Sequence, residues 1–260
     1  MLRRLEDAVR GPDGLVVAFS GGADSALVAA VAGRVHGVGA LAVTAVSPSL
    51  PPGELRGARE LAEHIGVRHR AVRTAELRVE AYRANGPDRC YHCKAELYGV
   101  LAGVAREEGL TAIASGTNLD DLGDVRPGLR AAAERGVLEP LVRAGLRKAD
   151  VREVSRELGL PTWDKPASAC LSSRFAYGIT ITTKGLARVG RAEQALKALG
   201  FGQVRVRDHG ETARIEVDPQ ELPRLAEPEA RESIVRELKA LGYRFVTMDL
   251  EGFRSGSLNP

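Results

Sequence analysis

The sequence predicts an α/β fold in which a parallel sheet is covered by helices on both faces, followed by a small α+β domain. Through the first half, short apolar runs alternate with helix-like stretches. Continuous apolar runs of this kind are typical of parallel strands that are buried on both faces. In the last third, apolar and polar residues alternate instead, which indicates strands with one buried face. We therefore expect a larger domain over residues 1–177 and a smaller one over residues 178–260.

The elements of the larger domain are expected to alternate along the chain. Strands are predicted over residues 15–19, 41–46, 68–73 and 111–114, and helices over residues 26–35, 54–64 and 94–108. The smaller domain is predicted to contain helices over residues 186–199 and 231–241 and strands over residues 203–207, 213–218 and 244–250. Because ligands of parallel sheets bind beyond the carboxyl ends of the strands, a functional site is expected in the loops that follow them.

Composition and charge argue against several classes of protein. The 260 residues are 44% hydrophobic, which is enough for a core, and 37 Lys and Arg against 34 Asp and Glu give a net charge of only +3. That excess is too small for a protein built around a nucleic-acid backbone. No export signal precedes the first predicted strand, and the longest apolar run, residues 26–32, is far shorter than the ~18 residues that cross a bilayer. We expect a soluble, cytoplasmic protein that binds neither nucleic acid nor membrane.

A glycine-rich loop that contains Ser20, Gly21, Gly22, Asp24 and Ser25 follows the first predicted strand. Backbone N–H groups that converge at a helix N-terminus bind anions, and the two glycines allow a phosphate to approach closely. The hydroxyls add donors, and the Asp24 carboxylate is a candidate ligand for Mg²⁺. The loop lacks the lysine of a Walker motif, and an ordinary glycine-rich turn is the alternative. The run resembles the SGGxDS loop of the N-type ATP pyrophosphatases, which form adenylates and release pyrophosphate.

Two other strand-end loops are candidates for nucleotide contacts. Ser47 opens a loop that resembles the segment where this superfamily holds adenine, although a plain surface loop is an equal alternative. Gly116 and Asp121 lie in a second loop that is rich in charged and amide side chains, namely Asn118, Asp120, Asp121, Asp124 and Arg126. Neighbouring carboxylates repel unless they share a cation, so Mg²⁺, an adenylate ribose or helix capping would each account for this cluster.

Three cysteines occur at two places in the chain. Cys90 and Cys93 form a C-x-x-C pair, and Cys170 follows in a Lys-Pro-Ala-Ser-Ala-Cys run. A redox pair requires a fold context that the preceding loop, residues 85–89, does not supply. A zinc site that includes His92, a 4Fe-4S cluster with one iron open to chemistry, and three unrelated buried thiols remain as alternatives. We expect both cysteine segments to lie on loops beyond strand ends, as a shared metal site requires.

Cys170 has a separate reason to be reactive. Lys165 and Arg174 flank it in the sequence, and nearby cations favour a thiolate.

Taken together, the motifs SGGADS, RCYHCK, ASGTNLDDLGDVRPG, WDKPASACLSSR and GFRSGSLN resemble the LarE family of ATP-dependent sulfur transferases. The resemblance implies that ATP adenylates the carboxylates of a pyridinium dicarboxylic acid mononucleotide. Sulfur then converts them to thiocarboxylates for the nickel-pincer cofactor of lactate racemase. Some members give up the sulfur of the single cysteine that corresponds to Cys170. Others hold a 4Fe-4S cluster on three cysteines, and the presence of Cys90, Cys93 and Cys170 indicates this branch.

The resemblance also implies roles for the smaller domain. Arg205 and Arg207 alternate on one predicted strand and would clamp the phosphate of the mononucleotide, with two solvated arginines as the alternative. Ser173 and Arg174 are candidates near the reacting centre, and Glu193 is a weaker one. The implied cofactors are ATP, Mg²⁺ and the 4Fe-4S cluster, with sulfide or another sulfur donor as co-substrate and a homo-oligomer, often a hexamer, as the assembly. A tRNA thiolase, an amidating synthetase or a nucleotide-binding protein with structural zinc remain as alternatives.

Overall fold

A computed structural model describes residues 1–123, 127–166 and 168–254. The chain forms two compact units, each assembled from more than one segment. The first unit comprises Met1–Ser47, Gly53–Glu76 and Asp88–Ser168, and the second comprises Pro48–Pro52, Leu77–Pro87 and Ala169–Pro260. We describe each unit by itself.

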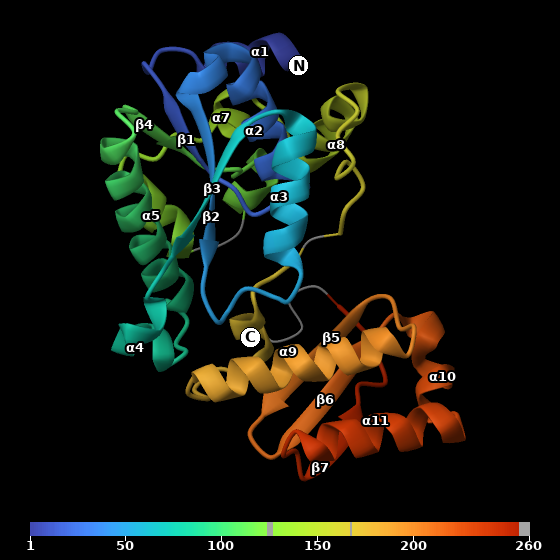
Figure 1. The fold of residues 1–260 in the computed structure, drawn as a ribbon. Helices are drawn as coiled ribbons and strands as arrows, with labels where there is room; N and C mark the ends of the chain where they lie inside the picture. The colour runs from blue at the N-terminus through green and yellow to red at the C-terminus, as the bar shows by residue number, and fades with distance from the viewer. Residues whose placement is uncertain (124–126, 167, 255–260) are drawn as a thin grey trace. The chain divides into compact units, whose positions relative to one another are not determined.

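The first unit is built on a four-stranded parallel sheet (Figure 1). Its strands are β1 (Leu15–Ala18), β2 (Ala40–Val46), β3 (Arg68–Arg73) and β4 (Ala112–Ala114), arranged in the order β3-β2-β1-β4. In the register, Leu15 lies beside Ala40 on one side and Ala112 on the other. The two central strands are almost wholly buried, which is why they read as continuous apolar runs.

Helices cover both faces of this sheet, so the predicted fold class is confirmed. They are α1 (Leu2–Val9), α2 (Ala23–His36), α3 (Glu54–Ile65), α5 (Arg89–Glu107), α6 (Pro127–Ala133), α7 (Pro140–Arg143) and α8 (Lys148–Glu157). One core cluster joins Val17 of β1 to Leu27 of α2, and a separate cluster joins Val16 to Leu101 of α5. Because neighbouring residues of a strand point to opposite faces, the two clusters lie on opposite sides of the sheet.

The second unit contains a small mixed sheet. Its strands are β5 (Val204–His209), β6 (Thr212–Val217) and β7 (Phe245–Met248), with β5 antiparallel and β7 parallel to β6. Its helices are α4 (Glu80–Arg83), α9 (Thr183–Ala198), α10 (Leu222–Ala226) and α11 (Pro228–Ala240). Val206 and Ile215 pack against Leu196 and Leu238 of the helices, so one face of the sheet forms the core, as the alternating pattern predicts.

The packing units differ from the predicted domains. The second unit begins at Ala169 and includes two earlier segments. Tyr82 and Ser172 join their hydroxyl oxygens at 2.5 Å, and Asn85 Nδ2 donates to the Ala176 carbonyl at 2.8 Å. A domain boundary placed from composition takes no account of such contacts between residues about 90 positions apart. The assignment of residues 1–177 and 178–260 as functional domains stays a prediction.

Several helices begin earlier than expected, and the early start of α5 has a consequence for the cysteines. Helix α5 begins at Arg89, five residues before the predicted start, so Cys90 and Cys93 lie in its first turns. The expectation that they lie on a loop is wrong. In the part of the chain that the structure describes, no helix combines the length and apolar character needed to cross a membrane.

Candidate functional site

The glycine-rich loop closes on itself between β1 and α2. The Ser20 and Ser25 hydroxyl oxygens lie 3.1 Å apart, and Ser25 Oγ also accepts a hydrogen bond from Ser20 N at 3.2 Å. Ser25 Oγ donates to the Gly22 carbonyl at 3.2 Å. Gly21 adopts a φ of +73°, which favours glycine, and Gly22 is the N-cap of α2. The loop thus holds the N-terminus of a 14-residue helix ready for an anion.

The loop after β4 lies against this glycine-rich loop. Asn118 Nδ2 donates to Asp24 Oδ1 at 3.1 Å, and Gly116 lies beside the backbone of Ser25. Asp121 accepts a hydrogen bond from Asn118 N at 3.0 Å, which fixes the loop that presents the amide. The structure therefore brings together three residues that the sequence named separately, Asp24, Gly116 and Asp121. Asp124 and Arg126 fall outside the described residues.

A lysine that the sequence analysis did not single out completes this cluster. Lys148 Nζ donates to Asp24 Oδ2 at 2.5 Å, so both carboxylate oxygens of Asp24 have a partner. Asp120 accepts hydrogen bonds from Lys148 N and from Arg147 Nη1, each at 2.8 Å. The backbone hydrogen bond, followed by the one from Arg147, holds the pKa of Asp120 below its usual value. Asp120 thus anchors the start of α8, and α8 presents Lys148 to the loop.

A second carboxylate lies near Asp121. Burial and, to a smaller extent, the charge of Asp121 raise the pKa of Glu139, while a hydrogen bond with Thr117 opposes the shift. Glu139 directly precedes α7 and was not anticipated. Two carboxylates whose charges are held close together are a place where Mg²⁺ would be stabilised.

A second lysine supports the loop from its carbonyl side. Lys165 Nζ donates to the Gly21 carbonyl and to Glu54 Oε2, both at 3.1 Å. Glu54 in turn accepts from Ser168 Oγ at 3.1 Å. The segment that precedes Cys170 is therefore tied to the nucleotide loop through Lys165, within the first unit.

In the second unit, Arg174 holds the backbone around Cys170. It is 2% exposed, and its Nη1 donates to the carbonyls of Ala169 and Cys170 at 2.8 and 3.0 Å and to Ser173 Oγ at 2.9 Å. Ser173 Oγ donates to the Cys170 carbonyl at 2.8 Å. Nε and Nη2 form a two-point pair with Glu193 at 2.8 and 3.2 Å. Ser173, Arg174 and Glu193 thus position the Cys170 turn.

These contacts show where the two cations near Cys170 direct their hydrogen bonds. Arg174 and Lys165 donate to carbonyl, carboxylate and hydroxyl oxygens, and the effect of their charges on the Cys170 sulfur stays a prediction. The half-buried thiol is presented by a rigid turn. Direct contacts of Ser173 and Arg174 with substrate stay predictions.

Arg205 and Arg207 are buried, so the alternative of two solvated arginines is wrong. Arg207 Nη2 donates to Glu216 Oε2 at 2.6 Å, and its Nη1 donates to the Ser173 carbonyl at 3.0 Å. Burial, and then the charge of Arg174, lower the pKa of Arg205 to about 10. Three guanidinium groups, those of Arg174, Arg205 and Arg207, share the carboxylates of Glu193 and Glu216. Arg214 Nη2 also donates to Glu216 Oε1 at 3.0 Å, so arginines and glutamates form one charged network here.

Comparison with known proteins identifies the family. Residues 3–95 are similar to the asparagine synthase family. Over 254 residues, the chain is 40% identical to the pyridinium-3,5-bisthiocarboxylic acid mononucleotide synthase of Lactiplantibacillus plantarum, covering 94% of this chain and 88% of the relative. The chain belongs to the LarE family. It is therefore an ATP-dependent sulfurtransferase, as the resemblance of its motifs implies.

Two uncharacterised relatives extend the comparison. A protein of Synechocystis is 48% identical over 247 residues, or 95% of this chain and 92% of the relative. A protein of Methanocaldococcus jannaschii is 27% identical over 241 residues, or 93% of this chain and 91% of the relative. The similarity spans both units, so the LarE assignment applies to the whole chain and not to the nucleotide loop alone.

The three cysteines of this LarE-family chain are divided between the units. Cys90 and Cys93 lie one turn apart on α5, where side chains three residues apart share a face, and Arg89 Nη2 contacts Cys90 Sγ at 3.7 Å. Cys170 is the N-cap residue of the short helix η4 (Leu171–Arg174) of the second unit. Among residues 1–123, 127–166 and 168–254, no group of three or more His, Cys, Asp or Glu side chains forms a metal site. The structure thus supplies two neighbouring thiols, and the third ligand stays a prediction.

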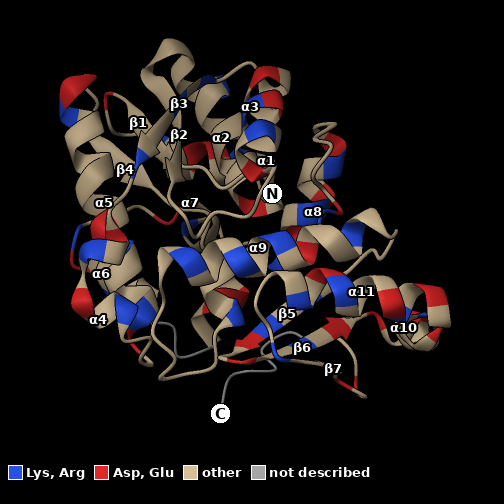
Figure 2. Cartoon of the chain, turned by 60° about the horizontal axis from the view of Figure 1, so that its bottom comes forward, with Lys and Arg blue, Asp and Glu red and all other residues tan. Residues whose placement is uncertain are grey.

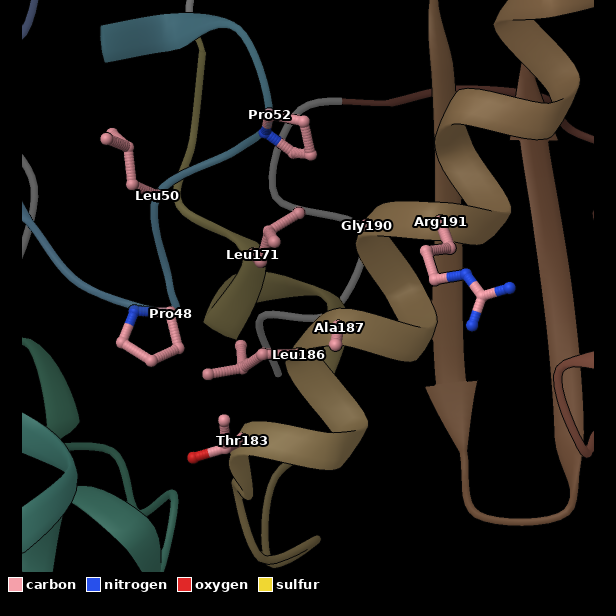
Figure 3. A pocket seen from close by; sticks show the side chains of 9 residues that line it. All are labelled: Pro48, Leu50, Pro52, Leu171, Thr183, Leu186, Ala187, Gly190 and Arg191. Atoms are coloured by element: carbon pink, nitrogen blue, oxygen red, sulfur yellow. The ribbon is translucent and has the colours of Figure 1, made fainter.

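The second unit also contains an apolar pocket of about 260 Å³ next to the Cys170 turn. In Figure 3, Pro48, Leu50 and Pro52 lie along one loop, and Leu171 lies between this loop and the helix α9. A Cβ atom on Gly190 would lie 3.2 Å from Leu171 Cδ1, so the glycine allows the turn to pack closely on α9. Ser47, which directly precedes this loop, lies at the end of the first unit's β2, and its contact with adenine stays a prediction.

Sequence reasoning missed Lys148, Lys165 and Glu54. No local signal pointed to Lys148, because no helix was predicted over residues 148–157 and its place at the start of α8 is known only from the structure. Lys165 was noted only as a neighbour of Cys170, and its contact with a loop 144 residues earlier could not be foreseen from spacing.

Proposed function

We propose that this enzyme converts the carboxylates of pyridinium-3,5-dicarboxylic acid mononucleotide to thiocarboxylates, and that the product serves the nickel-pincer cofactor of lactate racemase. The observation that carries the proposal is the 40% identity, over nearly the whole chain, to a synthase named for the bisthiocarboxylic acid mononucleotide. Such a substrate requires three features of the protein: a site for ATP, a site for the nucleotide phosphate and a source of sulfur.

The nucleotide loop suits the first step. A carboxylate oxygen of the substrate attacks the α-phosphorus of ATP, and the bond to the bridging oxygen breaks to release pyrophosphate. The N-terminus of α2 and the hydroxyls of Ser20 and Ser25 face the negative charge that moves onto the leaving group. Asp24, or the pair of Asp121 and Glu139, would hold the Mg²⁺ that neutralises the phosphates.

The second step transfers sulfur. A sulfur nucleophile attacks the carbonyl carbon of the adenylate, and AMP leaves with the electron pair of the broken C–O bond. Repeating both steps on the second carboxylate gives the bisthiocarboxylic acid. The rigid Cys170 turn, held by Arg174 and Ser173, supports a role for this thiol close to the reaction.

The arginine cluster suits the phosphate of the mononucleotide. Arg205 and Arg207 alternate with the valines of β5, and burial together with the charges of Arg174 and Arg207 lowers the pKa of Arg205. A phosphate group bound there would form charge-assisted hydrogen bonds in a desolvated setting, where they are strongest.

For the sulfur source, we propose a 4Fe-4S cluster ligated by Cys90, Cys93 and Cys170. The neighbouring thiols of Cys90 and Cys93 suit two ligand positions, and Cys170 would supply the third. A bound cluster would offer an open iron that carries a labile sulfide. A mechanism that consumed the Cys170 sulfur would leave the C-x-x-C pair without a role.

One anaerobic experiment tests the proposal. The full-length protein is incubated with ATP, Mg²⁺, sulfide and pyridinium-3,5-dicarboxylic acid mononucleotide, and mass spectrometry follows both the small molecules and the protein. We expect a gain of sulfur in the mononucleotide together with AMP and pyrophosphate, and an unchanged mass of the protein. Failure to form a thiocarboxylate under these conditions would refute the substrate assignment.

A further inference from the structure

We propose that Lys148 is a binding residue for the β- and γ-phosphates of ATP and for the pyrophosphate that leaves. The inference rests on the proposed use of ATP and adds a cation that the nucleotide loop itself lacks. From Ser20 to Ser25 the loop contains one charged side chain, the carboxylate of Asp24. A polyphosphate carries several negative charges, so a loop with a net negative side chain requires a positive group from elsewhere.

The position of Lys148 meets this requirement. Its ammonium lies 2.5 Å from Asp24 Oδ2, in the first turn of α2, beside the N–H groups at the start of that helix. An ammonium has three donors. Asp24 takes one of them, and among the described residues no other acceptor for Lys148 Nζ is found. The remaining donors are therefore available to phosphate oxygens without a break in the ion pair.

The contacts that hold Lys148 in place indicate that its ion pair with Asp24 is not an incidental surface pair. A cation at the first position of a helix is disfavoured by the helix dipole. The chain nevertheless fixes the backbone of Lys148 through Asp120, which also binds Arg147. The two side chains of the Lys148–Asp24 pair are only 33% and 25% exposed, so water screens them less than it screens a surface pair. Two acidic residues, Asp24 and Asp120, thus hold one lysine at the loop.

The other lysine near the loop has a different position. Lys165 donates to the Gly21 carbonyl, and the peptide link between Gly21 and Gly22 is trans, because the described chain contains no cis bond. In a trans peptide the carbonyl points away from the N–H of the next residue. Lys165 therefore lies on the side opposite the Gly22 N–H and braces the loop, whereas Lys148 lies at the helix start that faces an anion.

The proposal predicts a ligand-selective defect. Binding of ATP, pyrophosphate and AMP, each with Mg²⁺, is measured by calorimetry on the full-length protein. Lys148→Met should weaken binding of ATP and of pyrophosphate by about 10- to 100-fold and that of AMP by less than about 3-fold, because AMP lacks the β- and γ-phosphates. Arg152→Met is the matched control, since it removes one positive charge from an exposed position one turn further along α8. It should leave all three affinities unchanged.

Two further variants separate charge from packing. Lys148→Arg keeps the charge and should retain more affinity for pyrophosphate than Lys148→Met. Lys165→Met should weaken ATP and AMP alike, because it removes the brace of the loop. Circular dichroism establishes that each variant is folded before its affinities are compared.

Three results would overturn the assignment: equal losses for ATP and AMP in Lys148→Met, no loss for either ligand, or the same loss of pyrophosphate binding in Lys148→Arg as in Lys148→Met. Failure of the proposed substrate would show differently, as intact binding of ATP and pyrophosphate without any thiocarboxylate product.

Discussion

The backbone of Gly116 lies directly against that of Ser25. A Cβ atom on Gly116 would be 2.8 Å from Ser25 N, closer than real Cβ atoms approach a backbone, and 3.1 Å from Ser25 Cα, which is tighter than most real contacts. Because both sides of this contact are main chain, neither can move aside as a flexible side chain would. The loop after β4 can therefore support the nucleotide loop only if residue 116 has no side chain.

Gly116→Ala should lower the free energy of unfolding by about 1–3 kcal/mol and weaken ATP binding, because the added methyl displaces the start of α2. Urea denaturation and calorimetry measure the two effects. Gly99→Ala is the control, since Gly99 lies exposed within α5 and its Cβ would meet nothing within 4 Å. That change should stabilise the protein by roughly 0.5–1 kcal/mol. Unchanged ATP affinity in Gly116→Ala would contradict the supporting role.

Arg205→Met should raise the stability of the fold and weaken binding of the mononucleotide. The pKa of Arg205 lies near 10 because burial and Arg174 oppose its charge, so the folded state gains when the charge is removed. The melting temperature should rise, while affinity for the pyridinium mononucleotide falls and affinity for its dephosphorylated analogue is unchanged. Differential scanning calorimetry and titration of both ligands provide the readouts. Equal losses for the two ligands would place the phosphate elsewhere.

Removal of Glu193 should be among the most damaging single changes in the second unit. Its carboxylate pairs with Arg174, with side chains 6% and 2% exposed, and also accepts from Val206 N at 3.1 Å. Glu193→Ala leaves a buried guanidinium without its partner, which costs about 3–5 kcal/mol. Asp7→Ala, which breaks the exposed pair with Arg10, should cost less than about 1 kcal/mol. Similar losses in urea denaturation for both variants would refute this ranking.

The cysteines distinguish two sources of sulfur. If three thiolates hold a cluster, Cys90→Ser, Cys93→Ser and Cys170→Ser should each lose the broad absorption at roughly 400 nm and the sulfide-dependent turnover. If the Cys170 sulfur itself is donated, the protein should lose the mass of hydrogen sulfide as this residue becomes dehydroalanine. Full activity of Cys90→Ser, together with that mass loss, would replace the cluster by the sacrificial mechanism.

His69 should make the first unit less stable in acid. Its Nε2 lies 2.8 Å from Thr44 Oγ1, which donates to the Phe19 carbonyl directly before the nucleotide loop. Burial, and then the charge of Arg59, lower the pKa of His69 below 6.5. The unfolded chain therefore binds the proton first, and stability falls as the pH drops below about 6.5. Wild type should lose more unfolding free energy than His69→Gln between pH 8 and pH 5, and parallel profiles would exclude His69 as the cause.

The sequence was sufficient for the elements whose signal is local. The strands β1 to β3 were predicted to within one residue at each end, because each is a short run between clear turn residues. Helix α5 was predicted to begin too late, since Cys90, Tyr91 and His92 have weak helix propensity and the helix also depends on packing against α6. A local scale contains no information about that contact.

The site was predictable where one short segment forms it, and not where distant residues meet. The loop of Ser20 to Ser25 follows from its own residues. The pairing of Asp24 with Lys148 joins positions 124 residues apart, and nothing near either residue specifies the other. Burial of Arg205 and Arg207 also escaped prediction, because an arginine that alternates with valine has the pattern of a solvated strand face.

Figure 2 shows that charges of both signs are interspersed over the helices of each unit. The segments that form the two units also alternate along the chain. The second unit takes Pro48–Pro52 and Leu77–Pro87 from within the first half of the chain. Recombination at a single crossover between two family members would therefore join a foreign Ser172 to a native Tyr82, and a foreign Ala176 to a native Asn85. The carboxy-terminal third of this protein is not an exchangeable cassette, and chimaeras that alter substrate choice must carry residues 48–52 and 77–87 along with it.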